Sequence, residues 1–96
     1  MYNIPVGSFE WDEEKNRINS EKHGVTFEDA QHAFLDPNRL IVVDEGHSTE
    51  SEQRLHCIGM VSKRILTVRF VYRNDKIRVL GAGFWRKGKR TYEKED

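Results

Sequence analysis

Three arginines and a histidine stand at spaced positions in the second half of the chain, where they could form an anion site. Arg54 and His56 alternate along one predicted strand, Arg69 lies in the middle of the next, and Arg78 lies in a third. Alternate side chains of a strand point to the same face, so we expect these four on one side of a sheet. Guanidinium groups bind phosphate oxygens in pairs, which favours an anion ligand. The alternative is a set of ordinary salt bridges to the acidic half of the chain.

The charges are divided between the two halves of the sequence. Net charge is zero, but residues 1–53 carry 12 acidic and 4 basic side chains, and residues 54–96 carry 4 acidic and 12 basic ones. This asymmetry indicates a face for a polyanion, a face for a basic partner, or both. If the halves interleave in the fold, the charges instead neutralise each other.

The last segment combines cations with aromatic rings. Trp85, Arg86 and Lys87 belong to a run from 81 to 92 in which both types alternate, a composition that binds phosphates by charge and bases by stacking. Glycines at 81, 83 and 88 disfavour a long helix, so we expect a short C-terminal helix.

The first half of the chain is predicted to hold two helices. Asp12 is a good N-cap and Gly24 a good left-handed C-terminal cap for the first, after a short strand at 9–11. Asn16, Asn19 and His23 follow Asp12 along one helix face, which indicates a polar wall or lid or, alternatively, a solvated face. The second helix is predicted from 26 to 36, with an apolar stripe toward the core.

Beyond residue 39 the pattern changes to a period of two, which predicts strands joined by tight turns. The predicted strands cover residues 40–43, 53–60, 65–72 and 77–82. Leu66, Val68 and Phe70 should face the core, and Arg69 should stand on an open face. His47 lies in the loop before the second strand and is predicted to be solvated. The fold class is therefore α+β.

Composition limits the class of protein. Ninety-six residues predict a single domain spanning 1–96, and one cysteine, Cys57, excludes an internal disulfide and fits a reducing cytosol. Without an apolar run of membrane length or a signal-peptide pattern, we expect a cytoplasmic protein that does not enter a membrane. The histidines have no metal-ligand spacing, so we expect neither a metal nor another cofactor.

Several short motifs lie along the chain: F-E-W-D at 9–12, Lys15-Asn16, Asn19, K-H-G-V at 22–25, Asp36-Pro37, R-L-H-C-I-G at 54–59 and Tyr92-Glu93. Together they closely resemble the motifs of BrnT toxins, the toxic halves of BrnT/BrnA type II toxin–antitoxin pairs. One position departs from the family. Many BrnT proteins carry an S-A-R-x-A-type run before a longer helix, and Gly83 stands near the place of that arginine, so Arg86 would supply the charge from a shifted position.

The resemblance implies a RelE-like small domain, with two N-terminal helices on an antiparallel sheet of about four strands and a short C-terminal helix. It also implies metal-independent RNA cleavage, by attack of a ribose 2′-oxygen on the adjacent phosphorus, and inhibition of translation. In that reaction His23 would transfer a proton while Arg54 and Arg69 stabilise the phosphorane. The expected RNA-binding residues are Lys22, His56, Arg78, Trp85, Arg86 and Lys87, with His56 as a candidate second proton-transfer group.

The resemblance further implies a partner. BrnA antitoxins resemble ribbon–helix–helix DNA-binding proteins, so promoter DNA would be bound only through the antitoxin. Two other function classes compete with the nuclease. A non-catalytic module would bind RNA or protein without cleavage, and a structural subunit would show neither cleavage nor salt-dependent binding.

Overall fold

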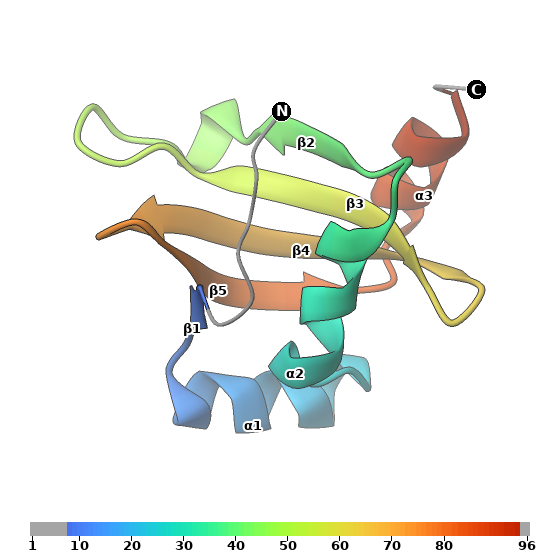
Figure 1. Ribbon diagram of the computed structural model, residues 1–96, viewed down its shortest axis with the longest axis horizontal. Helices are drawn as coiled ribbons and strands as arrows, with labels where there is room; N and C mark the ends of the chain where they lie inside the picture. Colours follow the sequence, from blue (N-terminus) through green and yellow to red (C-terminus); the bar gives the residue numbers. More distant parts are fainter. Residues whose placement is uncertain (1–7, 95–96) are drawn as a thin grey trace.

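The second half of the chain forms the centre of a five-stranded sheet, and the first half supplies helices that cover one of its faces. A computed structural model describes residues 8–94. In chain order the elements are β1 (Phe9–Glu10), α1 (Glu13–His23), α2 (Phe27–Ala30), the 3-10 helix η1 (Gln31–Leu35), β2 (Leu40–Val43), the 3-10 helix η2 (Glu45–His47), β3 (Leu55–Val61), β4 (Arg64–Arg73), β5 (Lys76–Gly83) and α3 (Arg86–Lys94). Figure 1 shows α1 beside β1 and β5, while α2 and η1 cross the sheet toward β2.

The strand order is β1-β5-β4-β3-β2. The four predicted strands are confirmed as antiparallel neighbours, and Ser62-Lys63 and Asn74-Asp75 form the β3–β4 and β4–β5 turns with positive φ at both residues of each pair. This geometry is that of two-residue type I′ hairpins. The sheet has one more strand than predicted, because β1 pairs in parallel with Ile77 and Arg78 of β5. A strand of two residues carries too little pattern to reveal its partner.

The core lies between this sheet and the helices α1, α2 and η1. Leu66, Val68 and Phe70 are fully buried there, as predicted. The opposite face of the sheet is less open than expected, because Thr67 and Val71 are also buried. Helix α3 packs on this face at Gly88, where an added Cβ would collide with Thr67. Arg69, between Thr67 and Val71 in the same alternating row of β4, remains exposed to solvent.

The polar face of α1 is neither a lid nor a solvated surface. The Asn19 amide donates to the carbonyls of Val25 and Ala82, at 3.1 and 3.0 Å, and accepts from the Ala82 N–H at 3.1 Å. Asn16 accepts from the Phe27 N–H at 2.8 Å and donates to Glu28 at 2.9 Å. Two buried amides therefore join α1 to β5 and to α2, in place of an apolar stripe.

Replacing Asn19 with alanine is expected to destabilise the fold by about 3 kcal/mol, because it leaves three buried backbone groups without partners. For a domain of this size, the melting temperature should fall by roughly 10–20 °C. Thermal denaturation followed by circular dichroism measures the change. Ile18→Ala is the matched control, since Ile18 is 46 % exposed on the same helix. Equal melting temperatures for the two variants would contradict this account of Asn19.

The helix ends follow the sequence closely. Asp12 Oδ1 accepts hydrogen bonds from the N–H groups of Glu14 and Lys15, and Gly24 ends α1 with φ of 71°. The second predicted helix is shorter than expected, because it gives way after Ala30 to the 3-10 helix η1, which ends before Asp36-Pro37. Within residues 8–94, no helix combines the length and apolar character needed to span a bilayer.

Candidate active site

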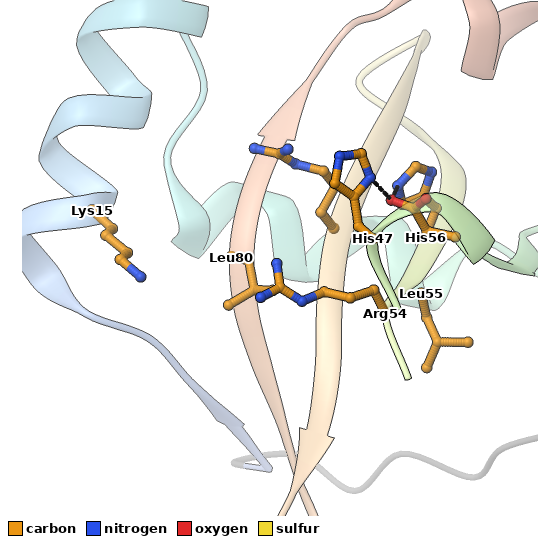
Figure 2. A pocket seen from close by; sticks show the side chains of 8 residues that line it. Lys15, His47, Arg54, Leu55, His56 and Leu80 are labelled. Carbon is orange, nitrogen blue, oxygen red and sulfur yellow. Dashed lines mark hydrogen bonds and ion pairs between the residues drawn. The ribbon is translucent and has the colours of Figure 1, made fainter. Parts of the chain in front are cut away.

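A pocket of about 180 Å³ opens on the face of the sheet that carries Arg69 (Figure 2). Strands β3, β4 and β5, the η2 segment and one side chain of α1 contribute to it. Its lining consists of Lys15, Asp44, His47, Arg54, Leu55, His56, Arg69 and Leu80. The prediction that Arg54, His56 and Arg69 share one side of the sheet is therefore confirmed.

Strand register places His56 directly beside Arg69. The two are paired across β3 and β4, and Arg69 is paired with Gly81 across β4 and β5. Gly81 gives the guanidinium its space, because a Cβ at this position would lie 2.6 Å from Nη2 of Arg69. The register shifts immediately afterwards, between Arg69 and Phe70. A glycine and an irregular register thus accommodate a long cation in the middle of the sheet.

A carboxylate holds two imidazoles at the edge of the pocket. Asp44 Oδ2 lies 2.8 Å from Nδ1 of His47 and 3.2 Å from Nε2 of His56, and Figure 2 shows the two rings on either side of it. The second contact is at ion-pair distance without the alignment of a hydrogen bond. As predicted, His47 is solvated, with its side chain 72 % exposed, and it also lines this pocket.

The surroundings of His56 and Asp44 determine the protonation state of each. Burial lowers the pKa of His56 below its ordinary value, the charges of Arg69 and Lys87 lower it further, and Asp44 opposes them only in part. Burial raises the pKa of Asp44, but the hydrogen bond and charges of the two histidines more than offset this and hold it below its usual range. At neutral pH, His56 is therefore a neutral imidazole beside an ionised carboxylate.

The two pocket arginines are not neutralised by carboxylates. Arg54 and Arg69 are both exposed, and within residues 8–94 neither forms an ion pair. The Lys15 side chain, from α1, points toward the side of the pocket that carries Arg54 (Figure 2). Three cations facing one carboxylate give the pocket a net positive charge, which suits a phosphate group.

Six of the nine predicted site residues do not line this pocket, and His23, Arg78 and Lys22 are three of them. His23 does not line the pocket, because its ring packs edge-on against Trp85 with the centroids 5.3 Å apart. Trp85 in turn lies between His23 and Arg69, whose guanidinium carbon is 5.4 Å from the ring centroid. Arg78 pairs with Glu10 at 3.4 Å beside β1, and Lys22 is an exposed side chain of α1. The imidazoles that line the pocket with the arginines are His56 and His47, and His23, the residue predicted to transfer a proton, is not among them.

Comparison with known proteins identifies the family. Residues 11–88 match a family described as "Ribonuclease toxin, BrnT, of type II toxin-antitoxin system". The chain belongs to the BrnT family. A type II toxin acts opposite an antitoxin, so membership implies an antitoxin partner. No curated protein matched the sequence.

Two residues that are far apart in the sequence, Asp36 and Tyr92, meet in the structure. The Tyr92 hydroxyl of α3 donates to Asp36 Oδ2 at 2.6 Å, and the Met60 N–H donates to the same oxygen at 2.7 Å. Burial raises the pKa of Asp36, but these hydrogen bonds, that from Asn38 N–H and the charge of Arg39 hold it below its usual value. Asp36 thus joins α3 to the segment after η1 and to β3.

The space beside the Cα of Gly83 is filled by the side chain of Trp85. An added Cβ at Gly83 would collide with the indole of Trp85. A residue with a side chain at 83 therefore requires Trp85 to move. Arg86 and Lys87 are exposed at the start of α3, and the charge of Lys87 acts on His56. Among residues 8–94, no cluster of three or more His, Cys, Asp or Glu side chains is arranged to hold a metal ion.

Proposed function

We propose that the chain is a metal-independent endoribonuclease whose scissile phosphate binds in the pocket between Arg54 and Arg69. The observation that supports this most is the meeting of two unpaired guanidinium groups with two imidazoles on one carboxylate. Guanidinium groups bind the non-bridging oxygens of a phosphate and stabilise the additional charge of a phosphorane. The imidazoles supply proton transfer near neutral pH.

The reaction assigns different roles to the histidines. In the tautomer with a proton on Nε2, facing Asp44, the Nδ1 of His56 accepts the proton of the ribose 2′-hydroxyl. The 2′-oxygen attacks the adjacent phosphorus, and the bond from phosphorus to the 5′-oxygen breaks. His47 enters this step as the imidazolium; its Nδ1–H donates to Asp44, and its Nε2 gives a proton to that leaving oxygen, which leaves a neutral ring. The products are a 2′,3′-cyclic phosphate and a 5′-hydroxyl.

The family supplies the biological setting for this chemistry. In our proposal the chain cleaves RNA in the cytoplasm and so inhibits translation, until a BrnA-like antitoxin binds it. That antitoxin is a ribbon–helix–helix protein, and the complex contacts promoter DNA through the antitoxin alone. We also propose that the fold is RelE-like. The proposed setting is supported by the family description, which is that of a ribonuclease toxin in a type II toxin–antitoxin system.

Incubation of the purified chain with single-stranded RNA at low salt, in the presence of EDTA, tests the proposed reaction. We expect fragments ending in 2′,3′-cyclic phosphate, and no cleavage of the same sequence with 2′-deoxyribose throughout. Cleavage that EDTA abolishes would contradict metal independence. RNA that stays intact at high protein excess would contradict the enzyme, and salt-dependent binding without cleavage would then indicate a non-catalytic module.

A further inference from the structure

A second groove, of about 710 Å³, lies between the β3–β4 turn and α3. Its lining includes four cationic side chains and two aromatic rings. The cations are Lys63, Arg64, Arg86 and Lys89, and the rings are Phe84 and Trp85. Among the described residues 8–94, Glu93 is the only acidic residue of the lining, and the four cations outnumber it.

The cations of this groove are available to a ligand. Within the described residues 8–94, none of the four forms an ion pair with a carboxylate. The guanidinium of Arg64 stacks on Phe84, with its central carbon 3.7 Å from the ring centroid. Stacking occupies the face of a guanidinium group, while its N–H donors lie in the plane and stay free for phosphate oxygens.

Trp85 connects this groove with the active-site pocket. Its indole lines the groove and also lies beside Arg69, which lines the pocket. The charge of Lys87, in the first turn of α3, acts on His56 of the pocket. An extended polyanion bound at Arg54 and Arg69 can therefore pass over the Trp85 side chain and contact the cations of the groove at the same time.

We propose that this groove binds the RNA strand on one side of the scissile phosphate, with phosphates on its cations and bases against Trp85 and Phe84. The inference rests on the proposed nuclease function and extends it to the recognition of the strand. A nucleic acid strand fits this groove better than an acidic peptide does. Every nucleotide carries a phosphate, which the cations can bind, and a flat base, which can stack on the aromatic rings. The volume is within the range of ligand sites.

The test measures binding of 2′-O-methyl RNA, which cannot undergo the reaction, by fluorescence anisotropy. The double variant Arg64→Gln/Lys89→Gln should raise Kd for a strand of about twelve nucleotides by roughly 10-fold, and lower the salt dependence by about one to two phosphate contacts. For a trinucleotide, which does not extend beyond the pocket, the increase should be far smaller. The control Arg73→Gln/Lys76→Gln removes the same charge from exposed positions at the β4–β5 turn, and should change Kd less than about 2-fold.

Three results of this RNA-binding assay would overturn the inference. They are wild-type affinity of the groove variant for the long strand, an equal loss for both lengths, or an equal loss in the control. An acidic peptide that binds the groove more tightly than RNA does would also overturn it. Because this assay requires no cleavage, it stays decisive for the groove even if the chain fails to cut RNA. Failure of the proposed nuclease is seen separately, in the EDTA experiment.

Discussion

Arg69→Ala is expected to lower kcat/KM for RNA cleavage by about 10²–10³, the effect of removing one preorganised donor from a developing oxyanion. Arg69 is exposed in the middle of β4, next to His56 in the register and free of ion pairs among residues 8–94. Its side chain contributes nothing to the buried core. The loss should therefore appear in cleavage, while the circular dichroism spectrum and the melting temperature stay close to those of the wild type.

Two further variants make the Arg69 prediction specific. Arg73→Ala removes an arginine from the same strand, one that pairs with Glu52 at 2.8 Å outside the pocket, and it should retain nearly full activity. Arg69→Lys keeps the positive charge but loses the bidentate hydrogen bonding of the guanidinium group. Its activity should therefore lie between those of Arg69→Ala and the wild type. If Arg69→Ala cleaves RNA as fast as Arg73→Ala does, the phosphate is not bound where we propose.

Local rules predicted the parts of the fold that depend on neighbouring residues. The caps at Asp12 and Gly24 and the turns at Ser62-Lys63 and Asn74-Asp75 follow from backbone preferences over a few residues. The exposure of Arg69 followed from the alternation of β4, since an unpaired guanidinium is costly to bury. Predictions of this kind need no knowledge of which segments meet in space.

The remaining features depend on contacts between distant segments. Asn19 looked like a surface residue because its partners, the backbone groups of Ala82, lie 63 positions away. Asp44 had no motif to mark it, and only the pairing of β2 with β3 brings it to His56. The choice of His23 followed the family motif, but the structure uses that histidine to support Trp85. Residue type and spacing therefore identified the arginines and missed the carboxylate that holds the imidazoles.

The largest loss should follow removal of the proposed base. His56→Ala is expected to lower kcat/KM by about 10³, within the range of general acid–base catalysis. His32→Ala is the matched control, because His32 is an exposed histidine of η1 and should leave cleavage unchanged. Equal activities of these two variants would remove His56 from the mechanism.

The pH dependence of kcat/KM tests the role of His56 independently of the size of that loss. The pKa of His56 in the folded protein is below its ordinary value, so the imidazole stays neutral to lower pH. The fall of kcat/KM on the acidic side of the profile, its acid limb, should therefore lie below pH 6.5. Asp44 raises this pKa and Lys87 lowers it. Asp44→Asn should therefore move the acid limb to lower pH, and Lys87→Gln should move it to higher pH, less so at high salt because Lys87 is exposed. A merely structural carboxylate and lysine would leave the limb in place, whereas two shifts of opposite sign identify His56 as the titrating base.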